Sequence, residues 1–297
     1  MAPEALRPSS RSLAADAALA SAVLQGHSIG GQETCIILPT LRLAFDSGRC
    51  PQRVVYQETL CLSHGHLDHA GGLHCYAATR AMLSLRPPDV LCPPPIEAAV
   101  KRMLASWGEL DGADIKADVR GVAPGDEFVL ASPKGFAVRP FATTHVVPSQ
   151  GYVITSRKQK LKAEYAGLPG QEIKALRQSG VAVTNMVEVA EAAITADTTM
   201  DFAQSDAPEV KLALTAKVFF MECTFVDDAM SIEGAREFGH THLDEIIAQA
   251  ELFENVGALV LIHFSPRYTR EAIVEALDRK LPPALKDKTV PLLEGFK

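Results

Sequence analysis

The segment Ser63-His64-Gly65-His66-Leu67-Asp68-His69 decides how this chain of 297 residues is interpreted. Three of the nine histidines and one aspartate lie here within six residues. Imidazole and carboxylate groups grouped in this way suit zinc and related divalent metals. Histidines that only satisfy hydrogen bonds in a core are not expected to gather so closely. The segment therefore predicts a metal site of the catalytic kind, which keeps an open position.

Strand and helix patterns on both sides of the motif predict a layered α/β fold. Residues 33–38, 41–45 and 59–63 are β-rich runs, and the last of them leads into a loop that carries the histidine cluster. Helical periodicity follows over residues 72–83 and 96–110. Strands and helices then alternate to a last helix over residues 270–281, and no Pro/Gly/Ser-rich linker separates them. We therefore expect one domain over residues 21–297.

Residues 1–20 form a separate stretch ahead of the domain. They contain serines and two arginines, as organelle transit peptides do, but Glu4 and Asp16 argue against that interpretation. We expect a disordered extension and leave organelle targeting open. No apolar run reaches the roughly 18 residues that a membrane-spanning helix needs. The six cysteines form no CxxC pair, so we expect reduced thiols and a cytoplasmic protein without a membrane partner.

Three further ligand candidates each follow an apolar strand. They are His145, Asp197 and His263. Taken alone, each is more often an ordinary polar residue at a strand end. Together with the motif they complete two coordination shells, and Asp197 is placed to bridge them.

The segment from Arg157 to Gly180 differs in charge from the rest of the chain. It carries six basic and two acidic residues, whereas the formal net charge of the whole chain is −7. The acidic balance argues against nucleic-acid binding over the whole surface, but a local basic patch remains open. We expect a short helical insertion, broken at Leu168-Pro169-Gly170, that returns to the body as a strand over residues 181–188. Its nucleic-acid-binding candidates are Lys158, Lys160, Lys162, Lys174 and Arg177; the alternative is a solvated helix face.

The motif resembles the HxHxDH signature of the metallo-β-lactamase superfamily, and this resemblance implies an αββα sandwich. Further segments are similar to the ordered motifs of the ribonuclease Z family of tRNA 3′-processing endonucleases, most of all to its short form in plants. These segments are Val147-Pro148-Ser149-Gln150-Gly151-Tyr152, Ala196-Asp197-Thr198-Thr199, Glu222-Cys223-Thr224-Phe225, Gly239-His240, and Leu261-Ile262-His263-Phe264-Ser265-Pro266-Arg267-Tyr268.

The resemblance also implies roles for individual residues. One metal would be held by His64, His66 and His145, the other by Asp68, His69 and His263, with Asp197 between them. The ions would be two zincs per chain, with manganese or another divalent metal as the alternative. Asp68 would orient the attacking water or accept its proton, while His240 would protonate the leaving group and Glu222 would orient His240. The implied reaction removes 3′ trailers from precursor tRNA and leaves a 3′-hydroxyl on the tRNA.

Some positions depart from the family pattern. Met221 and Cys223 flank Glu222 within the HEAT element, and His242 stands where the HST element has threonine. The Pro-x-Lys-x-Arg-Asn loop of longer bacterial relatives is absent. The basic insertion, at about residues 157–187, lies where the family inserts its tRNA-gripping arm. The family also tends to dimerise, which implies a homodimer.

Two residues and two other functions complete the sequence-based expectations. Ser265 and Arg267 are candidates for phosphate contact, because an arginine fork matches two phosphate oxygens; a local ion pair is the alternative for Arg267. The alternative enzyme is a small-molecule phosphodiesterase or thioester hydrolase on the same fold. A binding protein on an inactive fold is the alternative from another class, and the complete ligand set argues against it.

Overall fold

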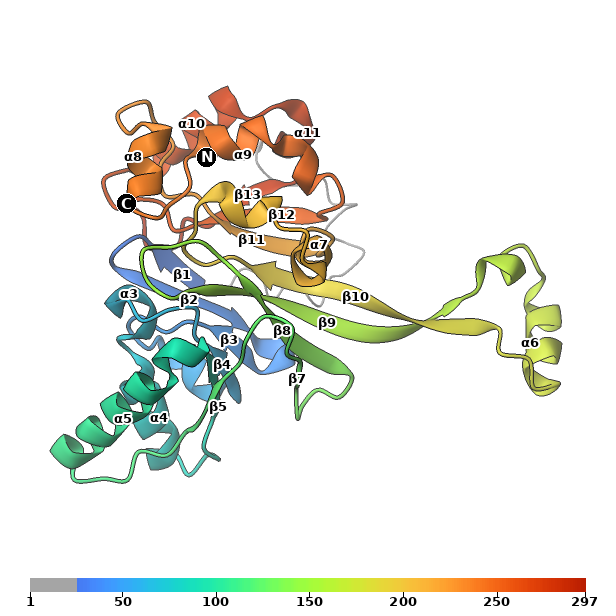
Figure 1. Ribbon diagram of the computed structural model, residues 1–297, viewed down its shortest axis with the longest axis horizontal. Coiled ribbons are helices and arrows are strands. Elements are labelled where there is room, and N and C mark those ends of the chain that lie inside the picture. The colour runs from blue at the N-terminus through green and yellow to red at the C-terminus, as the bar shows by residue number, and fades with distance from the viewer. Residues whose placement is uncertain (1–25) are drawn as a thin grey trace.

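Two β-sheets lie face to face in the computed structural model, which describes residues 26–297 (Figure 1). The extension expected over residues 1–20 lies outside the described residues. The first sheet has six strands, which neighbour one another in the order of the sequence. Its strands are β1 (Gly26–Ile29), β2 (Glu33–Leu38), β3 (Leu43–Phe45), β4 (Thr59–Cys61), β5 (Asp89–Cys92) and β6 (Asp118–Gly121).

The second sheet has seven strands in reverse sequence order, from β13 at one edge to β7 at the other. Strands β10 to β13 pair in parallel, and β7 to β10 pair antiparallel. The strands are β7 (Phe128–Val129), β8 (Phe136–Ala142), β9 (Gln150–Leu161), β10 (Thr184–Ile194), β11 (Val218–Glu222), β12 (Ala258–Ile262) and β13 (Thr289–Pro291).

Helices cover the outer face of each sheet. Buried side chains of α4 and α5 pack on the first sheet, and those of α7, α9, α10 and α11 pack on the second. The helices are α3 (Leu67–Ala70), α4 (Leu73–Met82), α5 (Glu97–Asp111), α6 (Gly170–Gln178), α7 (Pro208–Ala213), α8 (Ile232–Glu237), α9 (Leu243–Ala248), α10 (Arg270–Lys280) and α11 (Pro283–Lys286).

Strand β11 illustrates the sequence pattern of a strand that is covered on both faces. Val218 and Phe220 face the first sheet, whereas Phe219 and Met221 face the helices, and all four are buried. Successive side chains of a strand point to opposite faces, so a strand that is covered on both sides is apolar throughout. The four layers confirm the predicted αββα sandwich.

The basic insertion is partly helical, as predicted, with α6 after the expected break and β10 as the returning strand, but the helical prediction is wrong for residues 157–161, which belong to β9. Strands β9 and β10 continue past the body and pair with each other from Ile194 opposite Tyr152 out to Thr184 opposite Leu161. They form a two-stranded ribbon that projects from the sandwich, with α6 at its far end (Figure 1). The outer ribbon has no buried face, so its sequence lacks the alternation that marks a strand. We call residues 157–187 the arm.

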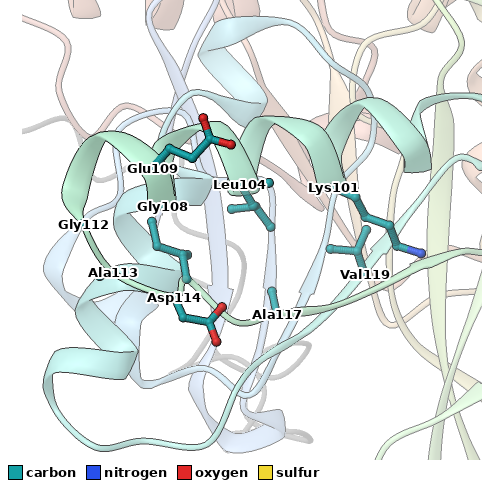
Figure 2. Close-up of a pocket in the computed structure, with 11 residues that line it drawn as sticks. Lys101, Leu104, Gly108, Glu109, Gly112, Ala113, Asp114, Ala117 and Val119 are labelled. Carbon is teal, nitrogen blue, oxygen red and sulfur yellow. The ribbon is translucent and has the colours of Figure 1, made fainter.

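One hollow lies apart from the histidine motif. A hollow of about 490 Å³ opens between α5 and residues 112–119, with Leu104 and Val119 among its lining residues (Figure 2). Of the described residues that line it, none is a predicted metal ligand.

Within residues 26–297, no helix combines the length and apolar character that crossing a membrane requires.

Candidate metal centre

The histidine motif begins on a loop after β4 and ends in a short helix. Ser63 and His64 follow the strand, and His66 is the residue before α3. The expectation that the whole motif lies on a loop is therefore wrong for Asp68 and His69, which belong to α3. Asp68 and His69 belong to one group of possible ligands, and His64 and His66 belong to a second group beside it, so the motif serves two neighbouring sites.

The first cluster contains His64, His66, His145 and Asp197, with one ligand atom of each within 4.8 Å of the others. His145 Nε2 lies 3.3 Å from His66 Nδ1. Asp197 Oδ2 lies 3.7 Å from His64 Nε2 and 3.8 Å from His145 Nε2. Three imidazoles and one carboxylate oxygen therefore converge on one point.

The second cluster contains Asp68, His69 and His263, again within 4.8 Å. Asp68 Oδ2 lies 3.5 Å from His69 Nε2 and 3.4 Å from His263 Nε2. Asp197 Oδ1 lies 3.2 Å from His69 Nε2 and 3.3 Å from His263 Nε2. The two carboxylate oxygens of Asp197 are thus divided between the clusters, as a bridging ligand requires.

Two buried atoms test whether metal ions fit this arrangement. His64 Nε2 and Asp197 Oδ1 are buried, and neither has a hydrogen-bond partner within the part of the chain that the structure describes. A buried polar atom without a partner is costly, and a cation between the clusters would satisfy both. Imidazole nitrogens and carboxylate oxygens are also the donors that zinc and similar ions take. The clusters are therefore suited to binding metal ions.

Asp46 and Ser63 orient the ligand rings from behind. Asp46 Oδ2 lies 2.8 Å from His69 Nδ1 and also accepts a hydrogen bond from the Ser63 hydroxyl. The same hydroxyl lies 2.9 Å from His64 Nδ1 and accepts a hydrogen bond from it, because its own hydrogen is donated to Asp46. In the neutral form, both rings carry their proton on Nδ1 and turn the Nε2 lone pair toward the cluster.

The rings of His145 and His263 are held in the same way. His145 Nδ1 donates to the Gly239 carbonyl at 2.8 Å, and His263 Nδ1 lies 3.0 Å from the Thr224 hydroxyl. Sequence reasoning missed Asp46 and Thr224 as supporting residues. The sequence does contain a signal for Asp46. This residue directly follows the apolar strand β3, just as several candidate ligands directly follow apolar strands.

Burial and neighbouring charge set the protonation of the cluster. Burial, assisted by the nearby His69, lowers the pKa of His64 to about 2 and keeps this ring neutral. Burial alone would raise the pKa of Asp197, but His263 and His69 hold it well below its ordinary value. Burial would lower the pKa of His69, yet Asp197 and Asp46 raise it well above its ordinary value. A metal cation would take the place of that proton, because metal binding displaces protons from its ligands.

Glu222 and His240 lie beside both clusters. Glu222 is fully buried at the end of β11, and its Oε1 lies 2.7 Å from His240 Nδ1. Burial alone would lower the pKa of His240, but the Glu222 carboxylate outweighs it and raises the pKa to about 9. The His240 ring centre lies 5.3 Å from the ring centres of both His145 and His263. The Glu222 carboxylate therefore favours the protonated His240 ring, which lies close to a histidine of each cluster.

Thr224 and Thr241 fix the Glu222 carboxylate. The backbone N–H of Thr224 donates to Oε2 at 2.9 Å, and the N–H of Thr241 donates to both oxygens at 3.1 and 3.2 Å. His242, where the family has threonine, is buried and forms a capping box with Glu245 at the start of α9. This departure from the family pattern therefore affects the helix start and not the ligand set.

A hollow of about 440 Å³ opens over the clusters. Ser265 lines it, as a residue that contacts substrate would. Arg267 instead donates to Asp227 at 2.8 Å and lies over the Phe225 ring at 5.0 Å, which is the local pairing considered above. The residues that line the hollow are Gly30, Gly31, His66, His145, Val146, Thr224, Phe225, Phe238, His240, His263, Ser265 and Pro266.

The five basic candidates lie on β9, on α6 or on the segment between them, and none of the five belongs to either cluster. Lys158 pairs with Glu191 at 2.7 Å at the base of the ribbon, and Lys162 lies 3.9 Å from Glu164. Lys160 is exposed on β9. Lys174 and Arg177 are exposed on α6.

Comparison with known proteins reveals related sequences over almost the whole chain. It is 46% identical over 273 residues to tRNase Z TRZ1 of Arabidopsis thaliana, covering 92% of this chain and 95% of that protein. It is 41% identical over 279 residues to the chloroplastic tRNase Z TRZ2 of the same plant, covering 94% of this chain and 77% of that protein. No family model matches the chain.

Solved structures agree on the fold. Human tRNase Z, short form (ELAC1), matches with a TM-score of 0.58 at 19% identity, covering 82% of this chain and 92% of that chain. The metallo-β-lactamase fold protein YhfI from Bacillus subtilis matches with a TM-score of 0.53 at 13% identity, covering 89% and 93%. The predicted metallo-β-lactamase fold is confirmed.

Proposed function

Because this chain belongs to the ribonuclease Z family, also called tRNase Z, we propose that it removes 3′ trailers from precursor tRNA as an endoribonuclease. A member of this family is a metal-dependent hydrolase of the metallo-β-lactamase fold. One observation carries the proposal: the Glu222–His240 pair stands beside two ligand clusters that share Asp197. This arrangement combines sites for phosphate-binding metals with a proton donor for the leaving oxygen.

The metal ions of this proposal are two zincs per chain, with manganese or another divalent metal as the alternative. His64, His66 and His145 would hold one ion, Asp68, His69 and His263 the other, and Asp197 both. When bound, such a pair supplies an activated water at neutral pH and stabilises charge on the phosphoryl group. The two atoms without hydrogen-bond partners, His64 Nε2 and Asp197 Oδ1, support this assignment.

The leaving group determines the role of His240. The ribose 3′-oxygen leaves poorly as an alkoxide at neutral pH, so a proton must reach it as the bond to phosphorus breaks. His240 holds that proton, and Glu222 orients the ring and keeps it charged. Asp68 orients the attacking water or accepts its proton, and the Gly31 N–H fixes its Oδ2 at 2.8 Å. The products are a 3′-hydroxyl on the tRNA and a 5′-phosphate on the trailer.

The arm and two residues near the hollow bind the RNA in this proposal. Lys160, Lys174 and Arg177 are exposed along the ribbon and α6, where they can neutralise phosphates. Lys158 and Lys162 contribute from the base and the middle of the arm. Ser265 lines the hollow, and Arg267 would reach phosphate by leaving Asp227. A small-molecule phosphodiesterase or thioester hydrolase has no use for such an arm.

Assembly and location complete the proposal. We expect a homodimer in which the arm of one protomer serves tRNA bound at the other, and light scattering after size-exclusion chromatography measures this directly. We also expect the protein in the cytoplasm, although the relative TRZ2 is named as chloroplastic. A fluorescent fusion at the C-terminus of the full chain tests the location without masking residues 1–20.

One assay tests the reaction itself. The purified zinc-loaded protein is incubated with a 3′-extended precursor tRNA, and the cut and both new ends are mapped. We expect a cut directly 3′ of the discriminator nucleotide, with a 3′-hydroxyl and a 5′-phosphate. His66→Ala is the matched control, because it removes a ligand. Absence of cleavage by the loaded wild-type protein, or a cut elsewhere on the RNA, contradicts the proposed function.

A further inference from the structure

Two apolar side chains are exposed at the hollow over the ligand clusters. Val146 is 59% exposed and Phe238 is 58% exposed, and both line the hollow. Val146 directly follows His145, and Phe238 lies two residues before His240. Large apolar side chains in water are tolerated singly, but two at the mouth of one site indicate an apolar occupant.

The backbone fixes where Phe238 stands. Gly239 has φ +76°, and a Cβ on it would lie 2.5 Å from His145 Nδ1, so only glycine fits against the ligand ring. The Gly239 N–H donates to the Arg236 carbonyl, and the His240 N–H donates to the Ala235 carbonyl. Phe238 is thus anchored on its C-terminal side by the residues that also place His145 and His240.

Phe238 is also more open than the other phenylalanine of the hollow. Phe225 is buried, and the Arg267 guanidinium covers its ring at 5.0 Å. The Phe238 side chain is mostly exposed. An open aromatic ring beside a site that acts on RNA offers a surface for a nucleobase, because every base has a π-face.

The geometry points to one nucleotide as the occupant. His240 serves the ribose 3′-oxygen that leaves, so the ribose and base 5′ of the cut lie next to His240. We propose that Phe238 stacks on this base, with Val146 lining the same hollow, and so positions the scissile phosphate over the clusters. The proposal rests on the proposed function, and it makes Phe238 a positioning residue that does not touch the reacting atoms.

The test is a mutant cycle between protein and substrate. Wild type, Phe238→Ala and Phe238→Trp are assayed on precursor tRNA that is intact, abasic 5′ of the cut, or abasic 3′ of the cut. With intact RNA, Phe238→Ala should lower kcat/KM by about 5- to 150-fold, the effect of losing one base–aromatic stack, mainly through KM. Phe238→Trp should restore activity. Leu110→Ala, an exposed apolar residue on α5, is the matched control and should change nothing.

The abasic substrates decide the outcome. We expect the difference between wild type and Phe238→Ala to vanish when the base 5′ of the cut is missing, and to persist when the base 3′ of the cut is missing. The reverse pattern, or an equal loss on all three substrates, overturns the proposal. If the wild type cleaves intact RNA and Phe238→Ala cleaves it equally well, the stacking proposal is overturned but the proposed function is not. Wild type that cleaves none of the substrates overturns the proposed function instead.

Discussion

Glu222 and His240 form a hydrogen bond of 2.7 Å between the buried Oε1 and the Nδ1 of a partly exposed ring. Glu222 also accepts from the backbone N–H groups of Thr224 and Thr241. The carboxylate therefore cannot turn away from the ring, and the unused Nε2 of His240 is left to act on the substrate. This pair separates leaving-group protonation from metal binding, so the two functions can be tested apart.

Replacing His240 by alanine should affect substrates according to their leaving groups. Cleavage of precursor tRNA should fall by about 10²- to 10⁴-fold, the usual contribution of a general acid. Hydrolysis of bis(p-nitrophenyl) phosphate should fall far less, because p-nitrophenolate leaves without a proton. Single-turnover rates on both substrates, with metal content measured in parallel, test this. Equal losses at unchanged metal content would make His240 a structural residue.

The pH dependence should reveal the role of Glu222. Its carboxylate raises the pKa of His240 to about 9, so the acid is protonated at neutral pH and is lost as pH rises through that pKa. Bound cations lower this pKa, so the comparison is between variants. In Glu222→Gln the alkaline fall of kcat for tRNA cleavage should move to lower pH. The pH profile for hydrolysis of bis(p-nitrophenyl) phosphate is the control, and Glu222→Gln should not shift it.

Removing the metal, by chelation or by replacing a candidate ligand, should change metal content together with stability or activity. Elemental analysis of the wild type should give two metal ions per chain, mostly zinc, and chelation should lower Tm because His64 Nε2 and Asp197 Oδ1 lose their partner. His66→Ala should lose both zinc and activity. At most one metal per chain after purification with excess zinc, or full turnover by His66→Ala, would count against the assignment.

Asp46 allows a test of the supporting residues. It accepts hydrogen bonds from Ser63 and holds His69 through Nδ1 without being a ligand candidate itself. Asp46→Asn should weaken zinc affinity by about 10- to 100-fold, as outer partners of metal ligands do. Competition with a chromophoric chelator measures the affinity. An unchanged affinity in a folded variant means that the His69 ring needs no such support.

The proximity of the seven candidate ligands was predictable from the sequence for a physical reason. Each follows an apolar strand or lies in the dense motif, and strand ends from both sheets meet at one edge of the sandwich. Asp46 was missed because its role appears only where β3 meets α3 in space. The outgoing half of the outer ribbon, residues 157–161, was predicted as helix because a strand pair exposed on both faces carries no alternating pattern, whereas the returning strand was predicted. Phe238 gave no sign in the sequence, since exposure of a side chain depends on the folded surface.

The structure also sharpens the test of the arm. Since β9 and β10 pair out to Leu161 opposite Thr184, a short Gly/Ser linker in place of residues 163–182 should keep the ribbon and remove only α6 and its flanks. Affinity for precursor tRNA should fall and its salt dependence should flatten, because Lys174 and Arg177 are lost. Hydrolysis of bis(p-nitrophenyl) phosphate should stay near normal, since no proposed ligand lies in this segment.

Charge reversal supplies the matched control for that deletion. Lys174→Glu with Arg177→Glu keeps α6 while removing its positive charge, so it should reproduce the loss of affinity and the flatter salt dependence. If the reversal has no effect but the linker weakens binding, the arm acts through shape and not through charge. If the linker leaves tRNA affinity unchanged, or abolishes both activities in a folded protein, residues 157–187 are not a tRNA-binding arm.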